Sequence, residues 1–324
     1  MKKILIIRLS SIGDIVLTTP VVRWLKTQLD CEIHYLTRLT NRQIIEANPY
    51  ISKIHTFDGD WTAMITELKA ENFDFIVDLH HSLRSLRIKW TLRKPASTFN
   101  KSNIKKWLMV NAKTLTGRKL VVSHIVERYL DTVKELGIQN DGKGLDYFIP
   151  EKDQDISTLI PTPFIENGYV AIAVGSKHIT KQIPVDKLIE VCQNTSENFV
   201  LLGDKNDLAK AEAIVHSAKA NNVFNTCATL NLNQSVAIVQ QSKYLIAGDT
   251  GLMHIAAALK KQVVSVWGCT VPEFGMFPYF PKGLEHLGKI VQVEGLPCRP
   301  CSKLGFEECP KKHFKCMTQI VIPN

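Results

Sequence analysis

Apolar segments with strand character alternate with helix-like amphipathic segments along the whole chain, and this alternation restricts the fold more than any other feature. Strands are expected at 2–9, 32–38, 53–58 and 73–80 in the first half, and at 168–175, 198–204, 222–228, 243–249, 262–268 and 289–295 in the second. Helices are expected between them, for example at 14–29, 60–72, 184–195, 206–220, 232–242 and 250–261. Such alternation predicts parallel sheets that are covered by helices on both faces.

The length of the chain predicts two such domains, because 324 residues exceed what one hydrophobic core usually serves. The pattern breaks over 149–168, where prolines cluster and no periodicity is sustained. We therefore expect an α/β protein with two doubly wound, Rossmann-like domains, residues 1–155 and 156–324, that face each other across a cleft. Ligands of such sheets bind beyond the carboxyl ends of the strands, so the cleft is the expected site.

Composition restricts where the protein acts. Apolar residues make up 45% of the chain and charged residues 22%, as in soluble globular proteins. The apolar runs are too short to cross a bilayer, and the basic start MKKILIIRL has too short an apolar core for a signal peptide. The sequence therefore predicts a cytoplasmic protein.

The net charge of +9 is concentrated in one region. Residues 79–126 contain eleven lysines and arginines but no aspartate or glutamate. A solvated basic face is one explanation. The complete absence of acidic residues favours an anionic partner instead, either a phosphorylated lipid, a membrane surface or nucleic acid.

Polar residues follow several expected strands of the second half. Asp249, Thr250 and Gly251 follow the strand at 243–249, and His254 lies one turn into the next helix. An ordinary helix cap explains these residues. Together they also suit a sugar diphosphate, with phosphates at the helix N-terminus and a carboxylate on the sugar hydroxyls.

Two further strand ends extend this pattern. Ser176 and Lys181 follow the strand at 168–175, and a lysine there can neutralise a diphosphate, although a surface loop explains it equally well. Asp207 follows the strand at 198–204, where a carboxylate commonly accepts ribose hydroxyls.

The first strand runs into RLSSIGDIVLTTPVVRWL, residues 8–25. Gly13 allows a ligand to approach the backbone, and the following helix offers its N–H groups to an anion. Asp14 therefore places a negative charge at a helix N-terminus, a position that would otherwise favour the binding of a phosphate. It is either a first-turn acid that the helix dipole stabilises or a group with a chemical role, although a helix N-terminus lowers the pKa of a carboxyl and weakens it as a base.

Four blocks of the sequence resemble the heptosyltransferase family, the glycosyltransferases of family nine that build the core of lipopolysaccharide. They are residues 4–25, 175–192, 201–207 and 247–268, the last continuing into CTVPEFGMFPY. The resemblance implies the GT-B architecture of two facing domains. It also implies an inverting, metal-independent transfer of heptose from ADP-heptose to the acidic inner core, which is Kdo–lipid A or its extended form.

The resemblance further implies a role for each domain and for particular residues. Residues 1–155 would bind the acceptor and residues 156–324 the nucleotide sugar, and Asp14 would be the general base that takes the proton of the acceptor hydroxyl. The donor would be held by Ser176, Lys181, Asp207, Leu230, Asp249, Thr250, Gly251 and His254. The acceptor would be held by Ser11, Gly13, Arg84, Arg87 and Lys89, and His80 and His81 are further candidates for this contact. Asp207 stands where the family usually has a glutamate.

The tail spaces Cys298, Cys301, Cys309 and Cys316 as C-x2-C-x7-C-x6-C. Four thiolates can hold a structural zinc ion, and a cytosolic compartment disfavours disulfides. Only one C-x2-C unit is present, and similar tails occur in family members that are regarded as metal-free. Both interpretations stay open, and no cofactor or catalytic metal is expected.

Two other functions stay open. An enzyme of the same fold that uses another nucleotide sugar would keep the same diphosphate motifs. A non-catalytic nucleotide-binding or nucleic-acid-binding protein would use the basic run, but few aromatic residues are interleaved there, which favours an acidic glycolipid. A monomer is sufficient for either enzyme, and contact with the inner face of the inner membrane is compatible with a lipid-linked acceptor.

Overall fold

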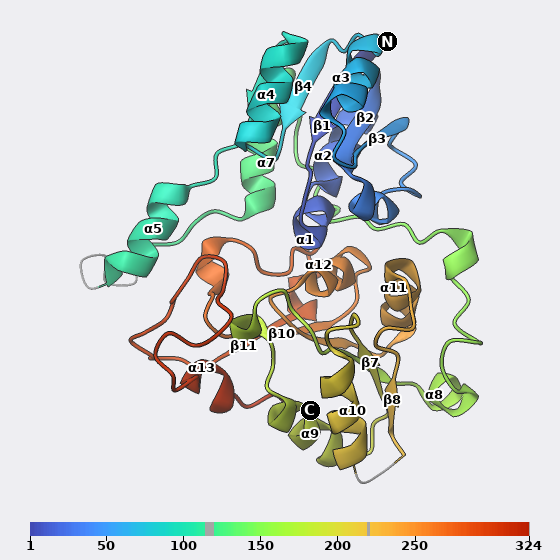
Figure 1. The fold of residues 1–324 in the computed structure, drawn as a ribbon, viewed down its shortest axis with the longest axis vertical. Coiled ribbons are helices and arrows are strands. Elements are labelled where there is room, and N and C mark those ends of the chain that lie inside the picture. Colours follow the sequence, from blue (N-terminus) through green and yellow to red (C-terminus); the bar gives the residue numbers. More distant parts are fainter. Residues whose placement is uncertain (114–119, 219–220, 324) are drawn as a thin grey trace.

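The computed structural model describes residues 1–113, 120–218 and 221–323. Its described strands form two parallel sheets, which Figure 1 shows one above the other. The first sheet has the order β3-β2-β1-β4-β5, with β1 (Lys2–Ile7), β2 (Cys31–Arg38), β3 (Lys53–Phe57), β4 (Phe75–Asp78) and β5 (Ala96–Thr98). The second has the order β11-β10-β9-β6-β7-β8, with β6 (Val170–Ala173), β7 (Phe199–Leu202), β8 (Val223–Asn225), β9 (Leu245–Gly248), β10 (Val263–Trp267) and β11 (Gly288–Gln292).

The helices follow the two sheets along the chain. The first unit contains α1 (Ile12–Val16), α2 (Thr19–Gln28), α3 (Trp61–Ala70), α4 (Leu83–Leu92), α5 (Asn103–Asn111) and α7 (Ile125–Val133). The second contains α8 (Thr162–Asn167), α9 (Val185–Gln193), α10 (Leu208–Ser217), α11 (Leu232–Gln241), α12 (Gly251–Ala258) and α13 (Lys315–Thr318). The end of the helix expected over 206–220 lies outside the described residues, as do Arg118 and Lys119 of the basic run.

Both sheets are buried on both faces, which explains why their central strands are apolar at consecutive positions. Ile4 and Ile6 of β1 share a core with α2 and α7, whereas Leu5 and Ile7 share a core with α3 and α4. In the second sheet one face packs on α9, α10 and α13, and the other packs on α11 and α12. The predicted parallel sheets with helices on both faces are therefore confirmed.

The prediction of a single helix over 14–29 is wrong, because the structure has two helices there, α1 and α2. Pro20 stands in the first turn of α2 and has no N–H to continue the preceding helix. The hydroxyls of Thr18 and Thr19 donate to the last carbonyls of α1 at 2.7 Å each. The strand β5 is not predicted either, because it is a short, partly exposed edge strand with the sequence AST.

The strand order fixes where a ligand can bind. It reverses between β1 and β4 in the first sheet and between β6 and β9 in the second. A crevice opens at the carboxyl ends of strands at such a reversal. The loop after β1 leads into α1 and the loop after β9 leads into α12, and these two helices contact each other where the units meet (Figure 1). The carboxyl ends of both reversals therefore face a common region.

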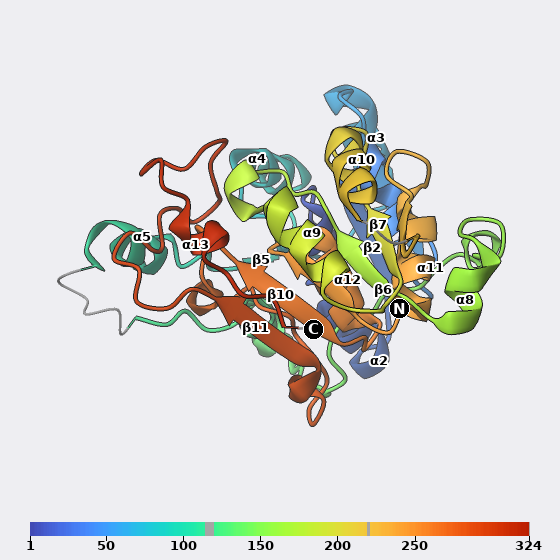
Figure 2. The ribbon, with the colours of Figure 1, turned by 90° about the horizontal axis from the view of Figure 1, so that it is seen from below.

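The helix α5 and the C-terminal tail lie next to each other at one edge of the molecule. Both lie at the left in the two views (Figures 1 and 2). Lys113 ties them together, because its Nζ donates to the carbonyl oxygen of Cys298 at 2.6 Å.

Candidate active site

Asp14 lies in the first turn of α1, directly beyond the carboxyl end of β1. Ser11 is the N-cap of this helix, and both its backbone N–H and its hydroxyl donate to Oδ2 of Asp14, at 3.2 Å and 2.8 Å. The guanidinium Nη2 of Arg8 lies 2.8 Å from the same oxygen. Oδ1 forms no hydrogen bond with any described residue, and 20% of the side chain is exposed. One carboxylate oxygen is thus fixed in place while the other is available.

The pKa of Asp14 reflects two opposing effects. Burial favours the neutral acid and raises the pKa, but the charge of Arg8 and the hydrogen bonds from Ser11 outweigh it. The net result is a pKa below the usual value for an aspartate. Asp14 is therefore ionised at neutral pH.

Arg8 is a part of this site for which the sequence predicts no role. Its side chain is buried, and it donates to the backbone oxygens of Ser10 and Leu79 and to the hydroxyl of Tyr129. Its position at the end of an apolar strand is a signal that could have identified it, because a charge is rarely buried there without a partner.

The second half of the site lies at the N-terminus of α12. Nζ of Lys181, in the loop after β6, lies 2.6 Å from Oδ2 of Asp249 in the loop after β9. The hydroxyl of Thr270 donates to the same carboxylate oxygen at 3.0 Å. A cation and an anion therefore stand together at the carboxyl ends of β6 and β9, next to the N-terminus of α12.

Two polar atoms at the start of α12 are buried without a hydrogen-bond partner among the described residues. They are Oγ1 of Thr250 and Nδ1 of His254. Burial lowers the pKa of His254 to about 4, so its ring is neutral at physiological pH. Such atoms are rare in folded proteins unless something else binds them, so they indicate a place for a polar ligand.

Two glycines let the halves of the site come together. A Cβ on Gly13 would lie 2.6 Å from Cδ2 of His254 and 3.4 Å from the Cα of Gly251. A Cβ on Gly251 would lie 2.8 Å from Cγ2 of Ile12. A larger residue at either position would collide with a side chain of the other helix.

The other expected donor residues lie around this point. Ser176 is half-buried at the end of β6, where its carbonyl accepts a hydrogen bond from Gln182 at 2.7 Å. Asp207 is buried, with its carboxylate packed so tightly under Gly175 that any Cβ there would collide with it, and burial raises its pKa. Leu230 is half-buried in the loop between β8 and α11.

The expected acceptor residues of α4 have other contacts. The guanidinium of Arg84 lies 5.0 Å from the ring centre of Phe57, and that of Arg87 lies 4.2 Å from the ring centre of Trp61. Nζ of Lys89 forms an ion pair with Asp78 at 2.9 Å. Within the described ranges, none of the three forms a hydrogen bond or ion pair with Asp14.

Three other cations interact electrostatically with Asp14. The charge of Asp14 raises the pKa of Lys101, Lys106 and Arg128, while burial lowers it more strongly in each of them. Lys303 of the tail repels both lysines. Nη2 of Arg128 is buried and has no hydrogen-bond partner among the described residues. We call Lys101, Lys106, Arg128 and Lys303 the cationic cluster.

The cationic cluster is not recognisable in the sequence as a unit. Lys101 and Lys106 belong to the basic run, but Arg128 lies beyond its end and Lys303 belongs to the tail. His80, which was expected nearby, is close to Arg8, and burial together with that charge lowers the pKa of its ring to about 4. His81 instead lies 2.8 Å from the carbonyl oxygen of Phe99 through its Nδ1.

One group of described residues has the geometry of metal ligands. His34 and His55 lie on β2 and β3 with Nδ1 of the first 3.0 Å from Nε2 of the second, and Glu71 is close to both. Lys53 and Lys3 occupy the two oxygens of Glu71 at 2.6 Å and 3.2 Å, and they hold its pKa at about 2. Two ammonium groups at this carboxylate favour a hydrogen-bond network over a cation site.

The tail cysteines do not form a comparable group. Within the part of the chain that the structure describes, the sulfurs of Cys298, Cys301, Cys309 and Cys316 do not converge at the spacing of metal ligands. Sγ of Cys301 donates instead to the carbonyl oxygen of Cys298 at 3.0 Å. The structure therefore offers no support for the zinc interpretation.

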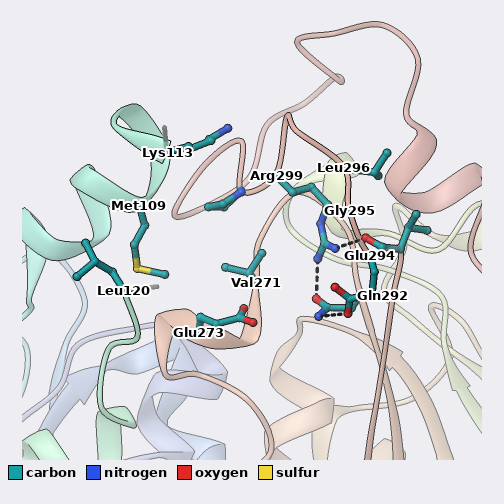
Figure 3. Close-up of a pocket in the computed structure, with 12 residues that line it drawn as sticks. Met109, Lys113, Leu120, Val271, Glu273, Gln292, Glu294, Gly295, Leu296 and Arg299 are labelled. Carbon is teal, nitrogen blue, oxygen red and sulfur yellow. Dashed lines mark hydrogen bonds between the residues drawn. The ribbon is translucent and has the colours of Figure 1, made fainter. Parts of the chain in front are cut away.

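A pocket of about 110 Å³ lies between α5 and the tail (Figure 3). Met109 and Lys113 border it on one side, and Val271, Glu273 and Arg299 border it on the other (Figure 3). Arg299 uses its guanidinium to bind the backbone of Gly268 and Val293, at 2.6 Å and 2.7 Å. This pocket is separate from Asp14 and Lys181, which do not line it.

Comparison with known proteins decides the family. The sequence profile of glycosyltransferase family 9 (heptosyltransferase) matches residues 61–309. The chain belongs to this family. It is 24% identical over 297 residues to lipopolysaccharide heptosyltransferase 1 of Campylobacter coli, and the alignment covers 83% of this chain and 84% of the relative. It is also 24% identical over 281 residues to lipopolysaccharide heptosyltransferase 3 of Escherichia coli K12, and this alignment covers 80% of both chains.

Solved structures of family 9 glycosyltransferases share the fold. The ADP-heptose lipopolysaccharide heptosyltransferase II of E. coli superposes with a TM-score of 0.72 over 98% of both chains, at 16% identity. A family 9 glycosyltransferase of Veillonella parvula superposes with a TM-score of 0.70 over 85% of this chain and 84% of the other, at 19% identity. The predicted GT-B architecture and glycosyltransferase class are confirmed.

Each helix in the described ranges is too short or too polar to span a bilayer.

Proposed function

We propose that this glycosyltransferase moves a heptose from ADP-heptose to the acidic inner core of lipopolysaccharide, Kdo–lipid A or its extended form. The observation that supports it most is the placement of Asp14 at one strand-order reversal, opposite the Lys181–Asp249 pair at the other. A base and a cationic diphosphate site thus meet across the contact of Gly13 with Gly251. The similarity to lipopolysaccharide heptosyltransferases supports the choice of donor and acceptor.

The second unit binds the donor in this proposal. The diphosphate lies at the N-terminus of α12 and takes Lys181 from Asp249, while Thr250 and His254 gain the hydrogen-bond partners that they lack. Asp249 is then free to accept sugar hydroxyls. Ser176 contacts the diphosphate, Leu230 contacts the adenine, and Asp207 acts near the ribose.

The reaction requires one base and a stabilised leaving group. Oδ1 of Asp14 accepts the proton of the acceptor hydroxyl as that oxygen attacks the anomeric carbon from the face opposite the diphosphate. The bond between the anomeric carbon and the diphosphate oxygen breaks, and ADP leaves with the electron pair, so the configuration inverts. Lys181 and the N–H groups of α12 stabilise the charge on ADP, and the proposal needs no metal ion.

The first unit binds the acceptor. Lys101, Lys106 and Arg128 of the cationic cluster interact electrostatically with Asp14, and the cluster suits the carboxylate and phosphate groups of an acidic, lipid-linked sugar. Ser11 and Gly13 border the reacting hydroxyl, while Arg84, Arg87 and Lys89 extend the basic surface along α4. We place the reaction in the cytoplasm, at the inner face of the inner membrane.

Calorimetry with ADP, UDP, GDP and dTDP in the presence of EDTA tests the proposal. We expect selective binding of ADP, and a loss of about 10-fold to 100-fold in Lys181→Ala because a charge-assisted contact is removed. Lys187→Ala, in which a lysine on α9 paired with Glu190 is lost, is the matched control and should bind ADP like the wild type. Preference for another diphosphate would contradict ADP-heptose as the donor, and binding of none of the four would contradict the proposed transfer.

A further inference from the structure

The helix α4 presents an apolar stripe to solvent. Leu83, Leu86 and Trp90 are 88%, 57% and 76% exposed. Their spacing of three and four residues places them on one face of the helix. The opposite face carries Ser85, Ile88 and Leu92, which are buried against the first sheet. The exposed stripe is thus a second apolar face of a helix whose core-facing side is already satisfied.

The next helix repeats the feature. Ile104 and Trp107 of α5 are 78% and 59% exposed and lie three residues apart, while Met109 is buried. In Figure 1, α4 lies at the top of the first unit and α5 lies below it at the left edge, and a connection through β5 joins them. We call Leu83, Leu86, Trp90, Ile104 and Trp107 the α4–α5 face.

Single exposed apolar residues are ordinary, but two tryptophans and three large aliphatic side chains on successive helices are not. Tryptophan is the side chain that favours the boundary between lipid and water. The surroundings are cationic, because residues 79–126 contain no acidic residue, and Arg93 and Lys94 follow directly on the end of α4. Apolar residues among basic ones are typical of helices that lie in the surface of an anionic bilayer.

We infer that the α4–α5 face docks on an anionic phospholipid bilayer. The aliphatic side chains and the tryptophans enter the boundary of the acyl chains, and the lysines and arginines contact the headgroups. The same segment carries Lys101 and Lys106 of the cationic cluster, so docking brings the acceptor side of the site to the membrane. The inference does not require transfer to occur, because vesicle binding can be measured on the protein alone.

Co-sedimentation with vesicles of phosphatidylethanolamine and phosphatidylglycerol tests the inference, with phosphatidylcholine vesicles for comparison. We expect the wild type to bind the anionic vesicles at least about tenfold more strongly. The double variant Leu86→Ser/Trp90→Ser should lose about tenfold or more of that affinity. The matched control is Ile165→Ser/Val215→Ser, which changes two exposed apolar residues of the second unit and should bind like the wild type.

A second measurement reports insertion directly. Brominated lipids should quench the tryptophan fluorescence of the wild type and quench Trp90→Phe less, because Trp24 and Trp267 are buried. Circular dichroism and calorimetry with ADP show that each variant remains folded. Absence of wild-type binding to anionic vesicles, or equal binding by the wild type and the double variant, would overturn the inference. ADP binding without vesicle binding would leave the proposed function standing, and the reverse result would leave the α4–α5 face standing.

Discussion

Nη2 of Arg8 lies 2.8 Å from Oδ2 of Asp14, and this contact joins the end of β1 to the first turn of α1. Ser11 donates twice to the same oxygen, so the carboxylate is held in one orientation. Arg8 in turn is anchored on the backbone of Leu79 and on Tyr129. The position of Asp14 relative to the second unit therefore depends on a buried residue that does not itself face the donor.

Replacing Arg8 should change the pH dependence of transfer. In Arg8→Gln the positive charge is gone and burial prevails, so the pKa of Asp14 rises. A base acts only above its pKa, so the acidic limb of kcat/KM should move upward by about one unit or more. Profiles measured on the wild type, Arg8→Gln and the charge-conserving Arg8→Lys would check this, and an unchanged limb in Arg8→Gln would contradict it.

Acceptor binding should become weaker at alkaline pH because Lys106 loses its charge there. Burial and the nearby Arg128 lower its pKa to about 8, so its charge is present below that pH and is lost above it. We expect the KM for a phosphorylated acceptor to rise by up to about tenfold between pH 7 and pH 9, with little change in kcat. Lys106→Arg should abolish the rise because a guanidinium stays charged; an equal rise in both proteins would exclude Lys106 as its cause.

Gly13→Ala tests the contact between the two units. The added methyl group would meet the ring of His254 at 2.6 Å, so that ring must shift or α1 and α12 must move apart. We expect kcat to fall by about tenfold to 100-fold through misalignment, and ADP to bind more weakly because His254 is displaced. Gly251→Ala should act similarly from the other side, through Ile12. Wild-type turnover in both variants would show that this contact does not matter for transfer.

Replacing Arg23 should destabilise the first unit. Its side chain is buried and binds Asp141 at 2.7 Å, Asp146 and the carbonyl oxygen of Gly144 at 2.8 Å. Arg23→Ala leaves two carboxylates without their cation, so the free energy of unfolding should fall by about 3–5 kcal/mol. Denaturant titration of this variant beside the exposed Arg42→Ala checks the value, and equal stability of the two variants would refute it.

The fold follows from local patterns that the sequence displays openly. The run Ile4 to Ile7 is apolar throughout because both faces of β1 are covered, and this burial is what makes a central parallel strand recognisable. Pro20 was visible as well, but the apolar spacing continues across it, so the division of the helix was not predicted. β5 carries almost no apolar signal and depends on pairing with β4.

The site was predictable only where strand ends mark it. Asp14, Lys181 and Asp249 all follow strands, and strand ends at an order reversal converge in space. The cationic cluster has no such marker, because Arg128 and Lys303 lie 175 positions apart and approach the site through tertiary packing. For Lys89, charge alone indicated a ligand contact, whereas Asp78 already binds it.

The central claim is that Asp14 is the base of a heptose transfer, and turnover of Asp14→Asn tests it most directly. ADP release from ADP-heptose with Kdo–lipid A should fall by about 1,000-fold or more, whereas the ADP affinity by calorimetry should stay within about twofold. Asp186→Asn, which changes a first-turn aspartate of α9, should retain wild-type turnover. Turnover by Asp14→Asn within a few-fold of the wild type would contradict the account.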